Sequence, residues 1–482
     1  MQFELTADPE AVAGLGRLKA LTAIRDGRPR SQSVKTIWHD SPEHALLADG
    51  LALAEQRGTW RLERAQPGTD TWLPAQPAPI VTESPDLGSL PSPLAPLATF
   101  EGRRTTSVHR LGEAAVTMTF EKGILRAVTA EQPVARILLS GEEPAVHDAA
   151  VLIADAVSAA VPVASLAAQA IALATGRAPP ARRRGAPVLP ASINGVPDAL
   201  AHIIGHLTDV VLAYAPLAAS LDEAGTEAVH QMRVAVRRAR SALSIFRPAV
   251  ESGAFDVITS GLKALGGQLG PSRDWDVFVD ETIPAIGEAL PDDPGLSRLA
   301  AAASRRRREH RAALAAYLAG SDFRRLGIEL AWFAAAKAWR TAPTEVDAPP
   351  TLTAFGATVL QHRWKKLVGA GKRMEELDIP ALHGVRLRAK RARYAAEMFA
   401  TLYQGKAAHR FIRRLSGLQE HLGVLNDGAV ATHLLQELGG PSGRHAYGAG
   451  VVAGFMAARA GKIRPRIILA FEKFRRQPAY WA

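Results

Sequence analysis

A basic helical pattern occurs twice in this chain, at a constant separation of 153 residues. The first copy, VHQMRVAVRRARSALSIF, covers residues 229–246, and the second, LHGVRLRAKRARYAAEMF, covers residues 382–399. Their matching histidine and basic positions are His230, Arg233, Arg237, Arg238 and Arg240 in the first copy and His383, Arg386, Lys390, Arg391 and Arg393 in the second. A repeated sequence unit folds as repeated structural units that pack on one another. We therefore expect a duplicated helical unit.

A second pair of blocks keeps the same register. LGPSRDWDV begins at Leu269 and LGVLNDGAV begins at Leu422, so that Asp274 corresponds to Asp427, again 153 residues later. Chance does not easily hold one register over two blocks, and we interpret the match as an internal duplication with no gap between its blocks. Two copies related by a pseudo-two-fold axis would bring both basic stripes together along one shared cleft.

The repeated pattern is that of an amphipathic helix. At about 100° per residue, the spacing i, i+3, i+7 and i+10 places the histidine and three arginines of the first copy within roughly an 80° arc. Apolar residues such as Leu243 and Phe246 lie on the opposite side, and residues 229–246 contain no acid. Like charges three or four residues apart repel, so a solvated face usually mixes charges of both signs. The uncompensated stripe favours a polyanionic ligand over the alternative of an ordinary solvated surface.

The net charge of +11 is concentrated in the duplicated part of the chain. Residues 1–200 hold 19 Lys and Arg against 21 Asp and Glu, a balance of −2, whereas residues 201–482 hold 39 against 26, a balance of +13. This asymmetry predicts an acidic partner for the second part, from the classes of nucleic acid, anionic lipid and polyphosphate. The absence of cysteine excludes a disulfide framework, a thiolate metal site and a cysteine nucleophile.

Local patterns divide the chain into three parts. Residues 1–178 are predicted to be mixed α/β, because the β-rich runs SVKTIWHD, GTWRLERA, AAVTMTFEKG and VARILLSG are bounded by turn residues. A Pro-rich loop is expected over residues 66–96, and the Pro, Gly and Arg content of residues 179–197 is typical of a linker. Residues 198–482 are predicted to be helical, with the two halves of the duplication at about 198–340 and 350–482.

One uncharged stretch, residues 156–176, is long enough to suggest a membrane span. It consists mostly of weakly apolar alanine and is interrupted by Pro162, so we expect a buried helix pair and no membrane span. No secretory signal is expected at the start of the chain.

Other charged residues have structural interpretations. The triple arginine Arg182–Arg184 and the basic helix ASRRRREHRAALAAYLAG, which begins at Ala303, are expected to be solvated charged surfaces. Asp274 and Asp276 follow an expected break at Pro271, where an Asp would cap a new helix and pair with a nearby Arg.

Four ordered blocks resemble a CHAD domain, the conserved-histidine α-helical domain. They are the H-x-x-R-V-x-x-R-R-x-R run from His230, LGPSRDWDV from Leu269, LHGVRLRAKRARY from Leu382 and LQEHLGVLND from Leu418. The resemblance covers roughly residues 198–480 and implies two pseudo-symmetric helical bundles that bind inorganic polyphosphate through a basic central surface. It implies no cofactor.

The same resemblance implies a set of ligand contacts. They are the five matching positions of each copy named above, together with Arg273. The second copy has Asn426 where the first has Arg273, so this corner of the surface is expected to be asymmetric.

Residues 1–178 resemble, less strongly, a CYTH domain of the triphosphate tunnel type. IWHDSPEHALLADGLALAEQRGTWRLER is similar to a family turn and the strand after it, and TFEKG and ILLSG are similar to later strands. CYTH enzymes begin with a Glu-x-Glu-x-Lys strand that holds Mg²⁺, but the corresponding stretch here contains Gln2, Glu4 and Thr6. A magnesium site needs several converging carboxylates. The resemblance therefore implies an antiparallel β-barrel or tunnel-like domain that has lost its metal site and hydrolysis.

The expected fold is thus an α+β tunnel-like domain followed by an all-α domain of two pseudo-symmetric bundles. The expected function is non-catalytic polyphosphate binding, because arginine grips phosphate oxygens bidentately and a polyanion that touches many cations gains by counterion release. One alternative is a metal-dependent inorganic triphosphatase whose helical domain recruits the substrate. Another is a nucleic-acid-binding protein, although the stripe lacks interleaved aromatic residues for base stacking. We expect the protein in the cytoplasm or at polyphosphate storage granules.

Overall fold

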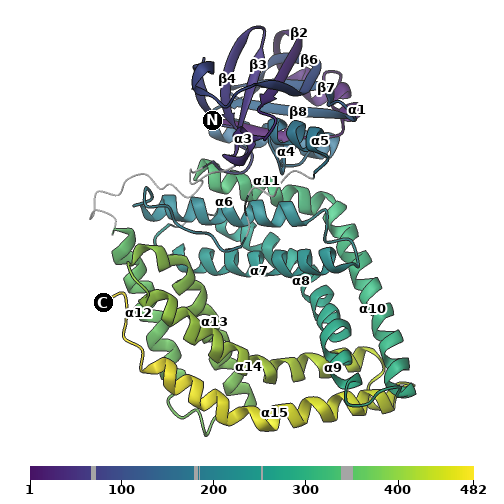
Figure 1. Cartoon of the computed structure of the whole chain (residues 1–482), viewed down its shortest axis with the longest axis vertical. Coiled ribbons are helices and arrows are strands. Elements are labelled where there is room, and N and C mark those ends of the chain that lie inside the picture. The colour runs from purple at the N-terminus through teal and green to yellow at the C-terminus, as the bar shows by residue number, and fades with distance from the viewer. Residues whose placement is uncertain (67–71, 178–182, 184, 251–252, 338–350) are drawn as a thin grey trace.

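The computed structural model describes residues 1–66, 72–177, 183, 185–250, 253–337 and 351–482. Figure 1 shows a strand-rich N-terminal part seated on a larger helical part. This is the fold class expected from the sequence. Within the predicted linker, residues 179–182 and 184 lie outside the described residues, and residues 185–195 form neither helix nor strand.

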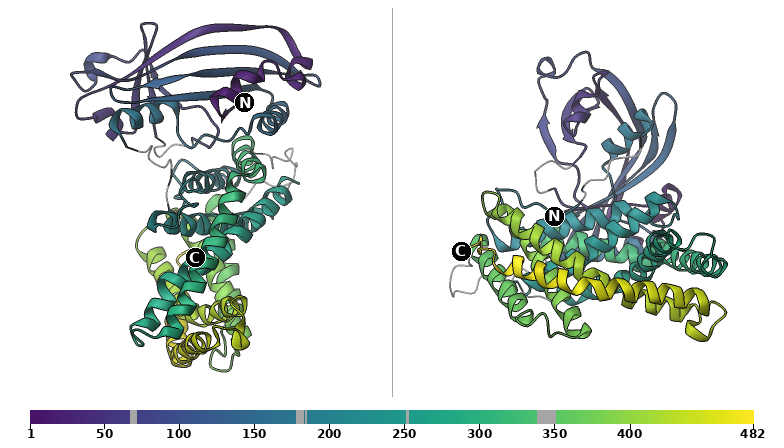
Figure 2. Two further views of the ribbon diagram at one scale, coloured as in Figure 1. Left: turned by 90° about the vertical axis from the view of Figure 1, so that its right-hand side faces the viewer. Right: turned by 60° about the horizontal axis from the view of Figure 1, so that its bottom comes forward.

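The N-terminal part is built on one antiparallel sheet with the strand order β1-β8-β7-β6-β2-β3-β4-β5. The strands are β1 (Gln2–Thr6), β2 (Arg25–Asp40), β3 (Leu51–Gln56), β4 (Thr59–Arg64), β5 (Ile80–Glu83), β6 (Ala95–Leu111), β7 (Ala114–Arg126) and β8 (Glu131–Gly141). The sheet curls into an incomplete barrel (Figure 2). Successive side chains of a strand point to opposite faces. In β1, Phe3 and Leu5 are therefore buried in the core, while Glu4 lines a cavity on the other face.

The four β-rich runs predicted from the sequence all lie in observed strands, namely β2, β4, β7 and β8. The expectation of one continuous Pro-rich loop over residues 66–96 is wrong, because β5 pairs with β4 and β6 begins at Ala95. All four residues of β5 are exposed. An exposed edge strand carries no hydrophobic alternation, so the pattern that reveals other strands is absent there.

Short helices complete the N-terminal part, and they are α1 (Pro9–Leu15), α2 (Lys19–Ala23), α3 (Ala45–Ala48), α4 (Glu143–Val157) and α5 (Leu166–Thr175). The uncharged stretch 156–176 therefore contains α5 and only the end of α4, which corrects the expected helix pair. Pro162 lies between the two helices, where it cannot interrupt a helical hydrogen bond. Ala167, Ala170 and Ile171 of α5 are buried together with residues of the curled sheet.

The helical part consists of α6 (Val196–Tyr214), α7 (Glu223–Phe246), α8 (Ala254–Val277), α9 (Ile283–Gly287), α10 (Pro294–Ala319), α11 (Ser321–Ala336), α12 (Leu352–Ala370), α13 (Ile379–Phe399), α14 (Ala407–Glu437) and α15 (Ala446–Arg475). The last residues of α7 and α13, 246 and 399, are 153 residues apart, and so are the first residues of α8 and α14, 254 and 407. The sequence register is therefore also the register of the helices.

A pseudo-two-fold axis relates the two sets of helices. Corresponding residues can touch only where they lie beside such an axis, and at least two pairs of described residues do so. The rings of Phe246 and Phe399 are 6.0 Å apart between centroids. Further along, a Cβ on Gly448 would lie 2.8 Å from the carbonyl oxygen of Gly295, so α10 and α15 approach closely through the same glycine in both copies. These two contacts mark the axis.

The N-terminal part packs on the first half of the helical part. Helix α11 contacts both α4 and α6, and His147 of α4 lies 3.2 Å from the Glu329 carboxylate of α11. On α6, Gly205 leaves the space that Leu73 and Pro74 fill, since a Cβ there would lie 2.6 Å from the Leu73 side chain. Among the described residues, Val196–Tyr214 is the one helix long and apolar enough to cross a membrane, but 83% of its most apolar window is buried inside the protein.

Two further expectations are corrected by the packing. Helix α8 continues through Pro271 without a break, because the fully buried Leu269 and Trp275 on either side of the proline hold the helix in place. Neither Asp274 nor Asp276 therefore caps a new helix. Arg183 is not solvated: it is buried, it donates to the carbonyl oxygen of Trp72, and its flanking arginines 182 and 184 lie outside the described residues.

Candidate anion-binding cleft

A pocket of about 180 Å³ lies where the two copies meet. Its lining comes from α7, α8, α13, α14 and the π-helical turn Phe278–Thr282. The lining contains five pairs of corresponding positions, which are Arg233 and Arg386, Arg273 and Asn426, Asp274 and Asp427, Val277 and Val430, and Phe278 and Ala431. His230, Arg237, Thr282 and Leu434 complete it. The pocket therefore lies on the pseudo-two-fold axis, and we refer to it with the adjacent Lys390 as the axial cleft.

Several cations of the axial cleft lie beyond ion-pair distance of any carboxylate among the described residues. Among the described residues, Arg237, Arg386 and Lys390 form no ion pair, whereas Arg233 lies 3.4 Å from the Asp274 carboxylate. Burial lowers the pKa of both Arg237 and Arg386, and the charges of neighbouring arginines lower each further, although the Asp427 carboxylate acts in the opposite direction on Arg386. Like charges are thus held together in a partly desolvated place, and an anion in the cleft would relieve their repulsion.

Lys390 shows the effect of this crowding most strongly. Burial, followed by the charges of Arg237, Arg386, Arg233 and Arg393, lowers the pKa of Lys390 to about 7. Its counterpart in the first copy is Arg237, whose guanidinium keeps its proton at any physiological pH. The two copies therefore supply one permanent and one titratable charge at corresponding positions.

Two carboxylates also face the cleft. Burial raises the pKa of Asp274 and Asp427, although Arg233 and Arg386, respectively, act in the opposite direction. Asp274 pairs with Arg233 of α7, whereas the adjacent Arg273, which the sequence suggested as its partner, binds Glu281. Asp427 makes no ion pair among the described residues.

The two histidines of the repeated pattern differ in position. His230 lines the cleft, and burial together with the charge of Arg273 lowers its pKa below the ordinary value. His230 is therefore a neutral group near pH 7. His383 is exposed and is not part of the pocket lining.

The remaining arginines of the repeated pattern do not line the axial cleft. Arg238 and Arg393 come from different copies and both bind Glu397, at 2.9 Å and 3.3 Å. Glu397 therefore links α7 to α13 beside the cleft. Arg240 and Arg391 are exposed, and Arg391 lines a separate pocket on the other side of α13.

Comparison with known proteins identifies a family domain within the helical part. A family model described as the CHAD domain matches residues 202–436. Residues 202–436 form a CHAD domain. The structure is similar to the crystal structure of the CHAD domain from the plant Ricinus communis, with 28% identity, a TM-score of 0.52, and 60% of this chain and 96% of that chain covered. It also matches PptA from Streptomyces chartreusis at 18% identity and a TM-score of 0.43, covering 57% of this chain and 99% of that chain. A search among curated proteins finds no match.

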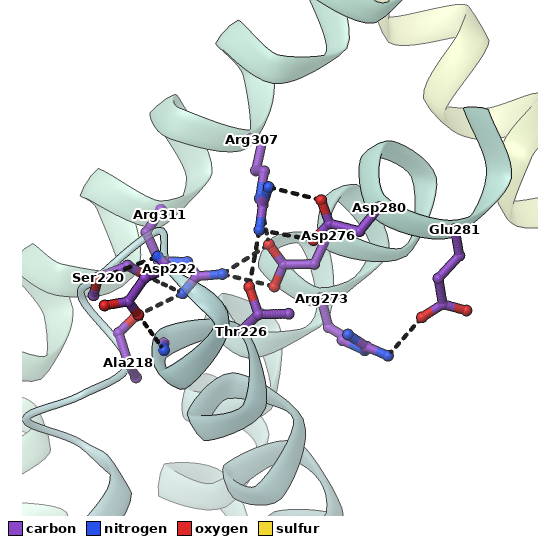
Figure 3. Close-up of polar contacts among 11 residues, drawn as sticks. Ala218, Ser220, Asp222, Thr226, Arg273, Asp276, Asp280, Glu281, Arg307 and Arg311 are labelled. Atoms are coloured by element: carbon purple, nitrogen blue, oxygen red, sulfur yellow. Dashed lines mark hydrogen bonds and ion pairs between the residues drawn. The ribbon is translucent and has the colours of Figure 1, made fainter. Parts of the chain in front are cut away.

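A buried ion-pair network stabilises the first half of the CHAD domain. Asp276 of α8 is fully buried and accepts two hydrogen bonds of 2.7 Å from Arg311 of α10, while Arg307 donates to it at 2.8 Å (Figure 3). Arg311 is only 2% exposed and also donates to the carbonyl oxygen of Ala218. The arginine-rich run of α10 is therefore not simply a solvated face. A search for uncompensated charge could not find this site, because the acid that binds these arginines is far away in the sequence.

Arg273, at the position where the two copies differ, also has a carboxylate partner within the protein. Arg273 forms an ion pair of 3.1 Å with the Glu281 carboxylate, drawn as a dashed line in Figure 3, and it lines the cleft at the position that Asn426 occupies in the second copy. The predicted asymmetry of this corner is thus visible as one ion pair that the second copy lacks.

The curled sheet encloses a second cavity, of about 550 Å³. Each of its three carboxylates is paired with an arginine: Glu4 with Arg136 at 3.0 Å, Glu63 with Arg61 at 3.2 Å, and Glu121 with Arg104. Trp38 also donates to Glu63 at 3.0 Å. Across the described residues, no group of three or more His, Asp or Glu is arranged to hold a metal ion. The charges of this cavity are therefore balanced, in contrast to those of the axial cleft.

Proposed function

We propose that the CHAD domain binds inorganic polyphosphate in the axial cleft, without hydrolysing it. The observation that carries this proposal is that a single pocket, lined by both copies, holds Arg233, Arg237 and Arg386 next to Lys390, and that three of these four cations form no ion pair among the described residues. A flexible anion with a charge on every repeating unit matches such a surface. Arginine binds phosphate oxygens through its planar fork of donors, and the release of counterions supplies much of the affinity.

The shape and chemistry of the cleft favour a narrow chain over a nucleic acid. A pocket of about 180 Å³ admits a single file of phosphate groups, but it offers little room for bases. Apart from His230, Phe278 is the one aromatic residue in its lining. Binding of single-stranded nucleic acid generally uses aromatic platforms on which successive bases stack.

Within this proposal, residues 198–482 provide the binding surface, and residues 1–178 form a tunnel-like domain whose inner charges are neutralised. A triphosphatase needs carboxylates free to hold Mg²⁺ and arginines free to grip the substrate. In the barrel cavity, each such carboxylate is paired with an arginine. The balance of charge thus supports binding without hydrolysis.

The decisive experiment is a competition for the full-length protein between long-chain polyphosphate and single-stranded DNA, matched in the concentration of charge. We expect polyphosphate to displace DNA, with a steep decrease of affinity as salt increases. Equal or tighter binding of DNA at matched charge would contradict the proposal. The same titration repeated with the Arg237→Ala variant places the binding in the cleft, because that variant should lose affinity for polyphosphate.

A further inference from the structure

A second basic pocket lies on the outer side of α13. It has a volume of about 460 Å³, and its charged lining consists of Arg363 and Lys366 of α12 and Arg388 and Arg391 of α13. At about 100° per residue, Arg388 points roughly 160° away from Arg386, which lines the axial cleft. The two pockets share no lining residue. They are therefore separate surfaces on opposite sides of one helix.

The charge of this outer pocket is uncompensated. Its lining contains no Asp or Glu, and residues 352–370, which form α12, contain none either. None of its four cations forms an ion pair with another described residue. Burial lowers the pKa of Arg363, and the charge of Arg391 lowers it further, so these guanidinium groups repel each other. Repulsion of this kind in a concave place is relieved by a bound anion.

The first copy shows that the cations of the outer pocket are not required by the fold. Arg388 corresponds to Ala235, which is 2% exposed in the core of the first half, and Arg391 corresponds to Arg238, which is paired with Glu397. In the second copy this face of the helix is open, since Arg388 and Arg391 are both exposed. An uncovered helix face needs polar residues, but charges of both signs would serve that need with less repulsion. All the charges are nevertheless positive.

The local backbone also makes room for a guanidinium group. A Cβ on Gly384 would lie 3.1 Å from Nη1 of Arg388, so the arginine side chain folds back over the glycine one turn earlier. A side chain at position 384 would require this group to shift by a few tenths of an ångström. The volume of the pocket lies within the range of about 300–1,000 Å³ that is usual for small-ligand sites.

We propose that the pocket formed by Arg363, Lys366, Arg388 and Arg391 is a second binding site for an oligophosphate anion, independent of the axial cleft. That the anion is inorganic polyphosphate rests on the proposed function. The second site itself rests on its own four cations. Two phosphate sites on opposite sides of α13 allow one long chain to pass over the helix and occupy both, which raises the affinity for long chains through effective concentration. They equally allow two chains to bind one protein molecule.

The test is a calorimetric titration of the full-length protein with tripolyphosphate, which is too short to span both sites. We expect two sites in the wild type and one in the variant Arg363→Gln/Arg391→Gln. The cleft variant Arg237→Gln should keep the outer site and weaken the other at least tenfold. The control is Arg305→Gln/Arg308→Gln, which removes the same charge from exposed positions of α10 and should keep both sites. Melting curves should show all variants folded, because the substituted outer side chains make no ion pairs.

The outcomes separate the two proposals. Two sites remaining in the outer variant, or the same loss in the α10 control, would overturn the outer site. A different result would separate the two proposals: the wild type shows a single site, and the outer variant loses it. That result would support the outer site and refute the proposed function, because the cleft would then bind no phosphate. A titration with long polyphosphate then distinguishes one chain that spans both sites from two chains that bind separately. A single chain spanning both sites predicts a one-to-one complex whose affinity falls at least tenfold in the outer variant. Two chains predict larger particles in light scattering that disappear in that variant.

Discussion

The residue that sets the chemistry of the cleft is Lys390. Because its pKa is lowered to about 7, the free protein holds this lysine only partly charged at neutral pH. A phosphate chain in the cleft would stabilise the ammonium form and raise its pKa, so binding between pH 7 and 9 should take up a proton. We expect calorimetry in two buffers of different ionisation enthalpy to show this uptake, and affinity to fall as pH rises above 7.

The variant Lys390→Arg should flatten this pH dependence, because arginine stays charged. It should show no proton uptake at pH 8, whereas unchanged uptake would assign the titration to another group. The lowered pKa also has a consequence for stability. Between pH 7 and the ordinary lysine value the unfolded chain binds the proton more tightly than the folded chain, so the contribution of Lys390 to folding becomes more favourable as pH rises.

Substitutions of Arg237 and Asp427 should change the affinity for polyphosphate in opposite directions. A hydrogen bond to a charged group contributes roughly 1.5–3 kcal/mol, so Arg237→Ala should weaken polyphosphate binding by about ten- to a hundredfold at low salt. The slope of log affinity against log salt should become shallower by about one unit for each lost phosphate contact. Lys390→Ala should weaken binding as much as Arg237→Ala does at pH 6, but by less at pH 8.

Asp427→Asn removes a negative charge beside Arg386 and should tighten binding about two- to tenfold, in line with the value of roughly 1 kcal/mol for a weak charge interaction. The measurement is the same salt-dependent titration. If neither Arg237→Ala nor Asp427→Asn changes affinity, the stripe is an ordinary charged surface.

At the scale of elements, α8 is held to α10 by Asp276. Replacement of Asp276 by Asn would leave Arg311 buried without its counterion, and breaking such a buried pair costs about 3–5 kcal/mol. We expect a lower midpoint of urea unfolding for Asp276→Asn. Polyphosphate affinity measured well below that midpoint should change little, because neither residue lines the cleft. The matched control is Arg247→Gln, since its ion pair with Asp256 is exposed and should matter little.

These elements also show what the sequence could reveal. The repeated pattern predicted α7 and α13, and its register of 153 residues predicted that both stripes would approach one axis. It did not predict that α8 would continue through Pro271. Those predictions depend on local periodicity and on repetition, which are properties of the sequence alone. Glu397 and Asp276 could not be predicted as the partners of Arg238 and Arg311, because partners so distant in sequence meet only through tertiary packing. The position of Arg391 in a separate pocket could not be predicted either, because the basic pattern does not indicate which side of α13 is exposed.

At the scale of the whole molecule, the curled sheet and the helices have separate expected roles. We expect no appreciable release of phosphate from tripolyphosphate with Mg²⁺ or Mn²⁺, because Glu4, Glu63 and Glu121 are each paired with an arginine in the barrel cavity. The assay includes Glu4→Gln as its control. Robust metal-dependent turnover that disappears in this variant would show that the ion pairs open to admit a metal, and the triphosphatase alternative would replace the proposed function.

The last prediction concerns the helical part alone. The lining of the axial cleft comes entirely from α7, α8, α13, α14 and the turn after α8, so the N-terminal part contributes no residue to it. A fragment of residues 186–482 should therefore bind polyphosphate as tightly as the full chain. Its stability should be lower, because removal of Leu73 and Pro74 exposes the apolar face of α6 beside Gly205.

Melting curves and polyphosphate titrations of the fragment and the full chain check both statements. Gly205→Ser in the fragment is a useful companion variant, since the space next to this glycine is empty once Leu73 is removed and a polar side chain there should improve solubility. In the full chain the same change would press on Leu73 and lower the melting temperature. A fragment that is folded by circular dichroism but has lost its affinity would mean that the N-terminal part takes part in binding, and the division of the chain into a binding and a non-binding domain would be wrong.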